Sequence, residues 1–381
     1  MKNICLLGAT GSIGQSTLDI IKKNKDKYCL KAFSFCHNID RAKEIIKEFA
    51  PLMVASPITL HTDTLKKEFP NLIYSNDIND IATFSCDNAV VINALVGSAG
   101  LMPTISTIKA GRGILLANKE SLVMAGEIVM EEADKQNVKV VPIDSEHSAI
   151  FQLLNEQNKK DIKKIIITAS GGALYNKTIE ELKEVTIDEA LSHPTWKMGA
   201  KITIDSATMM NKGFEIIEAY HLFHFPLEKI DVLLHDESII HSLVEMRDHS
   251  LLADLGVADM RIPISHALFE GNYHDLNVKS LSLEDITSIH FRKLDYSRYP
   301  ALNLCKKALS IGGSMPCVLN GANDVANLAF RENKIKFTEI EEIIEKVMNE
   351  HKLVMNPTLQ DLINVNNWAR YQAESIIKGD E

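Results

Sequence analysis

The sequence is poor in the features that mark membrane-spanning and secreted proteins. Its apolar runs are short, and none approaches the roughly 20 consecutive apolar residues of a membrane helix. The first such run, Ile4–Leu7, leads directly into glycines and is too short for the core of a signal peptide. We therefore expect a protein that works in the cytoplasm and does not enter a membrane.

Cysteine is scarce as well, with six residues and no CxxC pair. This argues against a zinc ribbon and against a disulfide framework. Several of the six stand in apolar, strand-like runs, so we expect buried free thiols. They are Cys5, Cys29, Cys36, Cys86, Cys305 and Cys317.

An excess of positive charge is also missing, since 41 basic residues face 51 acidic ones for a net charge of −10. This argues against nucleic acid or an anionic membrane surface as the main partner. It leaves room for a small anionic substrate, because a local site can oppose the global charge. A chain of 381 residues exceeds the usual size of one core, so two or three domains are expected.

What the chain does have is an alternation of apolar runs and amphipathic helical segments in its first half. This predicts an α/β fold with an N-terminal Rossmann-like parallel sheet covered by helices on both faces. The expected helices include Ser12–Asn24, Ile39–Phe49, Pro103–Ala110 and Ser121–Gln136. The expected strands are Asn3–Leu7, Cys29–Phe35, Leu52–Ala55, Leu72–Tyr74, Ala89–Leu95, Gly113–Ala117 and Lys139–Ile143.

The rest of the chain predicts a central α+β catalytic domain on a second sheet and a C-terminal helical domain. The expected helices of the centre are Lys212–Phe223 and Pro263–Glu270. Its expected strands are Ile165–Thr168, Lys201–Ile204, Val232–His235, Ile239–Glu245 and Leu251–Asp254, the last two as a hairpin across Met246–Ser250. We expect domains at residues 1–148, 149–271 and 301–381, with a linker at 272–300 and a flap around 190–200.

Glycines mark the first turn, where Gly8-Ala9-Thr10-Gly11-Ser12-Ile13-Gly14 joins an expected strand to an expected helix. Such glycines let the backbone approach a pyrophosphate, and the helix N-terminus supplies free N–H groups. The motif predicts a dinucleotide site; the alternative is a tight turn that binds nothing. The second expected strand ends in Cys36-His37-Asn38 without the acid that usually holds the ribose of NAD. This favours NADP, with His37 and nearby Arg41 as donors to the 2′-phosphate. The alternative is that both are ordinary loop residues, which is the simpler explanation for Arg41.

Two carboxylates, Asp144 and Glu146, follow the apolar run Val140–Ile143. In an extended segment they would point to the same side, and paired carboxylates suit Mg²⁺ or Mn²⁺. The simpler local explanation is a helix start, with Asp144 or Ser145 as the N-cap and Glu146 in the first turn.

Residues 205–215, which read DSATMMNKGFE, are expected to pass from a strand into a helix. Asn211 and Glu215 would share a helix face with Lys212 beside them. Lysine, serine and amide donors at a helix start suit a phosphate, and Glu215 would complete a metal site. The alternative is that Lys212, Glu215 and Glu218 are solvated surface residues.

Three further polar segments stand in loops, two of them directly after expected strands. Asn118-Lys119-Glu120-Ser121 stands at the carboxyl edge of the first sheet, where open α/β sheets bind ligands. Ser170-Gly171-Gly172 follows the strand Ile165–Thr168. The loop His193–Gly199 contains one of only two tryptophans, Trp196, and is either a lid that excludes water or a loop anchored by that side chain.

Seven motifs occur together and in order, and through them the chain resembles the 1-deoxy-D-xylulose 5-phosphate reductoisomerase family nearly end to end. They are GATGSIG at Gly8, LLANKESL at Leu115, PIDSEHSA at Pro142, ITASGGA at Ile167, HPTWKMG at His193, DSATMMNKGFE at Asp205 and DMRIPISHAL at Asp259. The resemblance implies a homodimeric enzyme of the non-mevalonate isoprenoid pathway. It would rearrange and reduce 1-deoxy-D-xylulose 5-phosphate to 2-C-methyl-D-erythritol 4-phosphate with NADPH and a divalent metal.

The resemblance also implies a role for each matching position. The metal ligands would be Asp144, Glu146 and Glu215. The catalytic residues would be Lys119, Glu146, His193 and Glu215, which with Ser145 face the substrate carbons and hydroxyls. The substrate phosphate would be held by Ser170, Ser206, Asn211 and Lys212. NADPH would be contacted by Thr10, Gly11, Ser12, Ile13, Cys36, His37, Asn38, Asn118, Glu120 and Gly199, with Trp196 and Met198 on the flap.

Two positions depart from the family pattern. Relatives often have lysine where this chain has His37, so the charge that faces the 2′-phosphate would depend on pH. Relatives often have proline before Asp-Met-Arg, where this chain has Ala258 in one wall of the pocket.

Two other functions fit parts of the pattern. A semialdehyde dehydrogenase would need a catalytic cysteine in the second domain, but no cysteine lies between Cys86 and Cys305. A non-catalytic NADP-binding regulator would need neither the carboxylates nor Lys212. The residues identify neither the general base nor which divalent metal is used.

Overall fold

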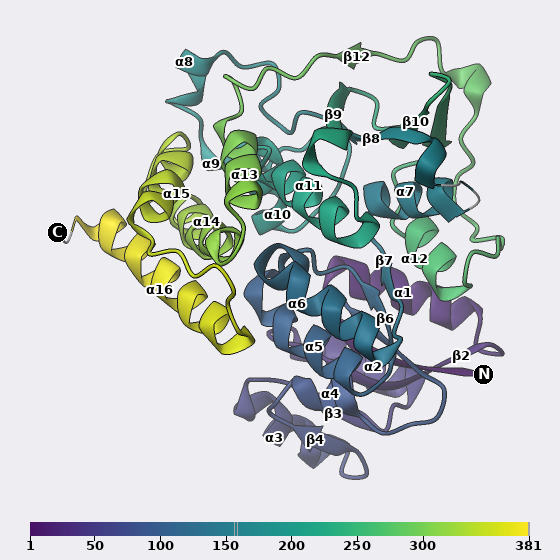
Figure 1. Ribbon diagram of the computed structural model, residues 1–381. Helices are drawn as coiled ribbons and strands as arrows, with labels where there is room; N and C mark the ends of the chain where they lie inside the picture. Colours follow the sequence, from purple (N-terminus) through teal and green to yellow (C-terminus); the bar gives the residue numbers. More distant parts are fainter. Residues whose placement is uncertain (156, 158, 380–381) are drawn as a thin grey trace. The chain divides into compact units, whose positions relative to one another are not determined.

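The computed structural model describes residues 1–155, 157 and 159–379, which form two compact units (Figure 1). Unit 1 comprises Met1–Ser121, Val129–Ser148 and Asp259–Val278. Unit 2 comprises Leu122–Ile128, Ala149–Ala258 and Lys279–Glu381. This division differs from the expected segments, because Asp259–Val278 fold with unit 1 and the C-terminal helices fold with the central sheet.

Unit 1 is built on a seven-stranded parallel sheet in the order β4-β3-β2-β1-β5-β6-β7. Its strands are β1 (Lys2–Leu7), β2 (Tyr28–Ser34), β3 (Met53–Ala55), β4 (Ile73–Ser75), β5 (Ala89–Asn93), β6 (Gly113–Leu116) and β7 (Val140–Pro142). The strand order reverses beside β1, which makes the carboxyl ends of β1 and β5 the switch point where such sheets bind ligands. The predicted Rossmann-like sheet is confirmed, and each predicted strand overlaps an observed one.

Alternate side chains of β1 bury different helices on the two faces of this sheet. Ile4 and Leu6 pack in one apolar core with α1, α2, α3 and α12, whereas Cys5 and Leu7 pack in another with α4. The helices with residues in unit 1 are α1 (Ser12–Lys23), α2 (Ile39–Phe49), α3 (Thr59–Glu68), α4 (Asn79–Thr83), α5 (Leu101–Lys109), α6 (Glu120–Gln136), α7 (Ser145–Asn155) and α12 (Arg261–Leu268).

Unit 2 contains a five-stranded mixed sheet in the order β11-β10-β8-β9-β12. Its strands are β8 (Ile162–Ala169), β9 (Ile230–His235), β10 (Ile240–Met246), β11 (Leu251–Leu255) and β12 (Phe291–Arg292). β10 and β11 pair antiparallel, which confirms the hairpin predicted across Met246–Ser250. The segment expected to be only a linker supplies the edge strand β12.

Helices make up the rest of unit 2, and those at the C-terminus are drawn in green to yellow in Figure 1. They are α8 (Ile179–Leu182), α9 (Ile187–Leu191), α10 (Ala200–Ala207), α11 (Met210–Phe223), α13 (Pro300–Ile311), α14 (Met315–Arg331), α15 (Glu339–Glu350) and α16 (Leu359–Lys378). The predicted C-terminal helical region is confirmed. Short 3-10 turns lie at Gly97–Gly100, Lys159–Asp161, Leu227–Lys229 and Leu283–Asp285. Across the described ranges, none of the helices has both the length and the hydropathy needed to cross a bilayer.

The local predictions for Lys201–Ile204 and for Cys36 were wrong. Lys201–Ile204 is not a strand but the first half of α10, because Lys201 forms an ion pair with Asp205 one helical turn later and Ile204 is buried. Cys36 is exposed rather than buried, because it lies beyond the end of β2. Cys29 and Cys86 are half-buried, and the other three cysteines are buried free thiols as predicted.

Candidate active site

The glycine-rich turn joins β1 to α1 in a conformation that needs glycine at two positions. Gly8 has φ +81°, and a Cβ there would lie 2.7 Å from the carbonyl oxygen of Ala94. A Cβ on Gly14 would lie 2.4 Å from the carbonyl oxygen of Gly8. Gly11 is the N-cap of α1. Because glycine has no side chain, it makes no side-chain capping hydrogen bond to the N–H groups of the first turn. The N–H groups of the first turn of α1, beginning at Ser12, are therefore available to an anion.

The end of β2 carries the residues expected to select the cofactor. Cys36, His37 and Asn38 are all exposed, and the Asn38 side chain caps α2 by accepting from the backbone N–H of Arg41 (3.0 Å). Arg41 is held by Gln15 and by an ion pair with Glu44, which favours the ordinary structural explanation for this residue.

A second histidine lies at the same strand end and was not found from the sequence. The His61 ring stacks on Phe35 with 5.8 Å between the ring centroids, and its Nδ1 lies 2.8 Å from the carbonyl oxygen of Cys36. It reaches this place from α3, 25 residues later in the chain, so only the tertiary fold reveals it.

Asn118, Lys119 and Glu120 follow β6 and are all buried. The Asn118 side-chain amide donates to the carbonyl oxygens of Leu95 and Gly97 (2.9 and 3.0 Å) and to the carboxylate of Glu120 (3.0 Å). These bonds fix the carboxyl edge of the sheet and hold Glu120 in place at the start of α6.

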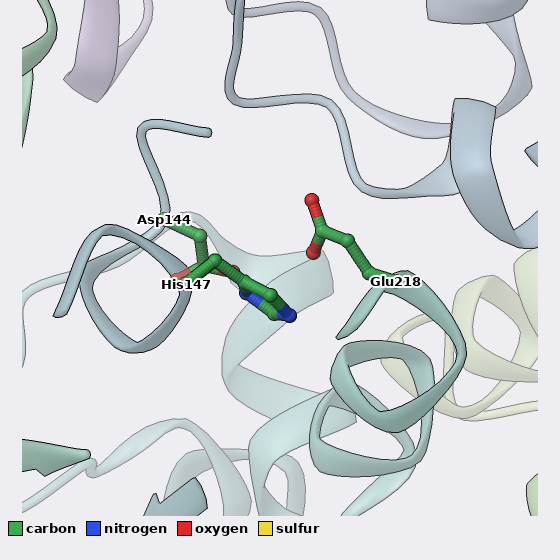
Figure 2. Close-up of side chains that lie close together, drawn as sticks. All are labelled: Asp144, His147 and Glu218. Atoms are coloured by element: carbon green, nitrogen blue, oxygen red, sulfur yellow. The ribbon is translucent and has the colours of Figure 1, made fainter. Parts of the chain in front are cut away.

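Asp144 and Glu146 do not share the extended segment that the prediction assumed. α7 begins at Ser145, so Glu146 lies in its first turn and the helix-start explanation is correct for the backbone. The Nζ of Lys119 lies 2.6 Å from the Asp144 carboxylate and the Nδ1 of buried His147 lies 3.8 Å from it. Figure 2 shows Asp144 and His147 side by side. Unit 1 thus brings Lys119 and Asp144 together, although they are separated along the chain.

The loop after β8 brings Ser170, His193 and Ser206 into one region of unit 2. A Cβ on Gly172 would lie 2.5 Å from the carbonyl oxygen of Ser206, so the loop packs directly on α10. The Ser170 hydroxyl accepts from the backbone N–H of Gly172 (3.2 Å) and lies 3.1 Å from the Nε2 of His193.

The segment from His193 to Gly199 has no regular secondary structure. His193 Nδ1 accepts from the backbone N–H groups of Thr195 and Trp196 (3.2 and 3.0 Å), so the proton of the neutral ring is on Nε2 and points to Ser170. The Trp196 ring lies 6.3 Å from the His241 ring, and Met198 is half-buried. Gly199 is the exposed N-cap of α10.

The residues of α11 that were expected near the phosphate and metal are buried, which overturns the surface alternative. Lys212, Glu215 and Glu218 are 4%, 0% and 1% exposed. Lys212 forms an ion pair with Glu215, and the Asn211 amide donates to the same carboxylate (2.6 Å). Figure 2 also draws Glu218 on this helix. Burial lowers the pKa of the neighbouring His221 to about 4, so that ring is neutral.

A helix, not the expected strand, precedes these residues. α10 ends at Ala207, and Met209 adopts φ +64° before α11 begins. Ser206 is therefore on the last turn of α10, while Asn211 and Lys212 are on the first turn of α11. A cation, an amide and a hydroxyl at such a helix junction are the donors that a phosphate requires.

Comparison with known proteins matches the whole chain. The family profile described as 1-deoxy-D-xylulose 5-phosphate reductoisomerase matches residues 4–126, and profiles of the C-terminal domains of this enzyme match residues 140–223 and 255–372. The proteins of this name from Listeria innocua and Bacillus pumilus are 47% and 49% identical over 384 and 382 residues, covering 99% of this chain and 100% of theirs.

Solved structures give the same result. A crystal structure of DOX-P reductoisomerase in complex with NADPH, fosmidomycin and magnesium has a TM-score of 0.94 and 35% identity, covering 99% of this chain and 98% of that one. The enzyme from Zymomonas mobilis in complex with NADPH has a TM-score of 0.91 and 37% identity, covering 99% of both chains. The chain therefore belongs to the 1-deoxy-D-xylulose 5-phosphate reductoisomerase family.

Proposed function

We propose that this chain converts 1-deoxy-D-xylulose 5-phosphate to 2-C-methyl-D-erythritol 4-phosphate with NADPH and a divalent cation, in non-mevalonate isoprenoid biosynthesis. The proposal rests on the burial of charged side chains on α11, in a chain that belongs to this enzyme family. Lys212 and Glu215 are both removed from solvent. Buried charges lower stability unless they are paired, and they are commonly kept where a charged ligand binds.

The cation would be held by Asp144, Glu146 and Glu215. Carboxylate oxygens are the ligands that Mg²⁺ and Mn²⁺ prefer, so the donor chemistry fits either ion. Lys119, whose Nζ lies next to the Asp144 carboxylate, would orient that ligand and then contact the substrate.

NADPH would lie along the first turn of α1, contacted by Thr10, Gly11, Ser12 and Ile13. The missing side-chain cap at Gly11 and the close glycine packing fit a pyrophosphate there. Cys36, His37 and Asn38 would face the 2′-phosphate, while Asn118, Glu120 and Gly199 would contact the rest of the cofactor.

The substrate phosphate would be bound within unit 2 by Ser170, Ser206, Asn211 and Lys212. Ser170 and Ser206 are supported by the packing of Gly172 on α10, and Lys212 by its ion pair. Binding energy from this group, which takes no part in the chemistry, would serve to order the flap with Trp196 and Met198.

When bound, the cation supplies a Lewis acid and NADPH supplies a hydride. Lys119, Ser145, Glu146, His193 and Glu215 would surround the reacting carbons and oxygens. His193 offers an N–H donor at Nε2, because its Nδ1 already accepts two backbone hydrogen bonds. A closed flap would exclude water from the reduction step.

We further propose that the enzyme is a cytoplasmic homodimer without a nucleic-acid or membrane partner. The acidic net charge of −10 supports the absence of a nucleic-acid partner. Sedimentation at equilibrium would test the dimer.

A steady-state assay with deoxyxylulose phosphate, NADPH and Mg²⁺ or Mn²⁺ tests the function. NADPH oxidation should depend on both substrate and metal and should fall by about three orders of magnitude after exhaustive EDTA treatment. Re-addition of metal should restore it. Full activity in EDTA would contradict the metal assignment, and no turnover with any divalent metal would contradict the activity.

A further inference from the structure

Asp205 is a buried carboxylate beside the residues proposed to bind the phosphate, but it is not one of them. It is 2% exposed and immediately precedes Ser206 on α10. Its Oδ1 accepts from the side-chain amides of Asn323 (3.0 Å) and Asn327 (2.8 Å), and its Oδ2 lies 3.1 Å from the Nζ of Lys201. The carboxylate is thus held from three sides.

The two asparagines come from α14, more than a hundred residues later in the chain. They lie one helical turn apart, both are fully buried, and both point their amide groups at one oxygen. Asn327 also donates to the carbonyl oxygen of Lys201 (2.9 Å). Side chains of α14 therefore bind α10 both at Lys201 and, one turn later, at Asp205.

The contact continues to the C-terminal helix through alternating charges. Lys201 Nζ lies 3.5 Å from Asp324, and Asp324 pairs with Arg370 of α16 at 2.7 Å. Two positive and two negative groups therefore alternate from Arg370 of α16 to Asp205, the residue next to Ser206.

The junction that this network supports is conformationally demanding. Met209, a residue with a side chain, adopts φ +64°, which costs free energy unless the surroundings impose it. On one side of Met209 is Ser206 and on the other are Asn211 and Lys212. A small tilt of α10 would therefore separate the hydroxyl from the lysine.

We propose that Asp205 is a positioning residue that sets the affinity for the substrate phosphate by fixing α10 on α14. The proposal rests on the proposed function, in which Ser206, Asn211 and Lys212 bind that phosphate. It gives the C-terminal helices a part in substrate binding, because Asn323 and Asn327 hold the carboxylate and Arg370 completes the charge chain.

Electrostatics and positioning predict opposite effects for Asp205→Asn. Removing a negative charge near an anion site would by itself strengthen phosphate binding. Loss of position would weaken it, since a misplacement of about 1 Å can change rates by on the order of a hundredfold. A purely structural role would lower the melting temperature and leave the affinity of the folded enzyme unchanged.

The experiment measures the dissociation constant of inorganic phosphate by calorimetry, and KM and kcat for the sugar phosphate, on the full chain. Asp205→Asn should raise both the dissociation constant of inorganic phosphate and the KM for the sugar phosphate by roughly tenfold to a hundredfold, with NADPH affinity unchanged. Asn327→Ala, which removes one donor and keeps the charge, should show a smaller shift of the same sign. Lys336→Gln, which removes an exposed ion pair with Glu184, is the matched control and should change neither.

Lys212→Ala separates the two levels of the proposal. If it abolishes phosphate binding while Asp205→Asn and Asn327→Ala bind phosphate as wild type does, the positioning role is wrong and the phosphate site stands. Tighter phosphate binding by Asp205→Asn would also overturn the positioning role. If Lys212→Ala itself leaves phosphate binding unchanged, the phosphate site is wrong and the role of Asp205 falls with it.

Discussion

The turn of unit 1 proposed to bind the cofactor (the cofactor turn) and the part of unit 2 proposed to bind the substrate phosphate (the phosphate region) would bind an anion by different means. The turn is contiguous, Gly8 to Gly14, and offers backbone N–H groups that need only room and the right backbone angles. The phosphate region gathers side chains from the loop after β8, from α10 and from α11, and buries charges among them. We therefore expect the cofactor turn to lose affinity when an added side chain crowds its backbone. We expect the phosphate region to lose affinity when one charged side chain is removed.

The largest effect is expected for Lys212→Ala, in the phosphate region. A buried charged contact to phosphate contributes roughly 2–5 kcal/mol, so kcat/KM should fall by about 30-fold to several thousandfold. Lys183→Ala, which removes an exposed lysine paired with Glu180, is the control and should have little effect. A loss of less than about tenfold for Lys212→Ala would mean that the phosphate is held elsewhere.

Crowding is tested next, by Gly14→Ala. The added methyl group would lie 2.4 Å from the carbonyl oxygen of Gly8, so the turn must shift, at a strain of about 1–3 kcal/mol. NADPH should bind roughly tenfold to a hundredfold more weakly by direct titration. For Gly113→Ala, in β6, no heavy atom of the described chain beyond its neighbours lies within 4 Å of the new methyl group. Equal NADPH affinity in both variants and wild type would show that the turn can accommodate a methyl group at Gly14 without moving the binding groups.

How far the sequence predicts each region follows from the same contrast. The turn, its strand and its helix are encoded by neighbours in the chain, and the prediction for them is confirmed. Lys201–Ile204 was mispredicted because its β-branched residues favour a strand locally, while packing against α14 imposes a helix. The burial of Lys212 and Glu215, and the partners of Asp205 at Asn323 and Asn327, depend on contacts that no local pattern encodes.

A half-buried carboxyl group of unit 2, Glu341, allows a test through stability. Burial raises the pKa of Glu341, whose carboxylate accepts from the backbone N–H of Ala301, to about 7. Between about pH 4.5 and 7 the folded chain keeps a proton that the unfolded chain has lost, so stability should fall as pH rises through this window. The loss is at most about 3 kcal/mol.

Glu341→Gln should remove that loss, because the amide oxygen still accepts the hydrogen bond and carries no charge. The melting temperature of the variant should exceed that of wild type at pH 8 and match it near pH 5. Glu345→Gln, an exposed change on the same helix, should follow the wild-type curve. Parallel pH curves for wild type and Glu341→Gln would show that the carboxyl is ionised without cost.

The smallest expected effect concerns His37, a side chain proposed to face the 2′-phosphate of the cofactor. His37 is exposed at the end of β2, and Arg41 is held by Gln15 and Glu44. A lysine at this position would pair its charge with the 2′-phosphate, whereas the histidine ring offers a hydrogen bond. NADPH should therefore bind a few-fold more tightly to His37→Lys than to wild type, whereas NADH, which lacks that phosphate, should bind both equally.

Direct titration of NADPH and NADH into wild type and His37→Lys at pH 8 measures this difference. His61→Gln is the matched comparison. His61 lies at the same strand end, but its Nδ1 is already in contact with the carbonyl oxygen of Cys36. Identical NADPH affinities for wild type and His37→Lys would mean that the 2′-phosphate is recognised by other groups, and weaker NADPH binding by His61→Gln would point to that second histidine.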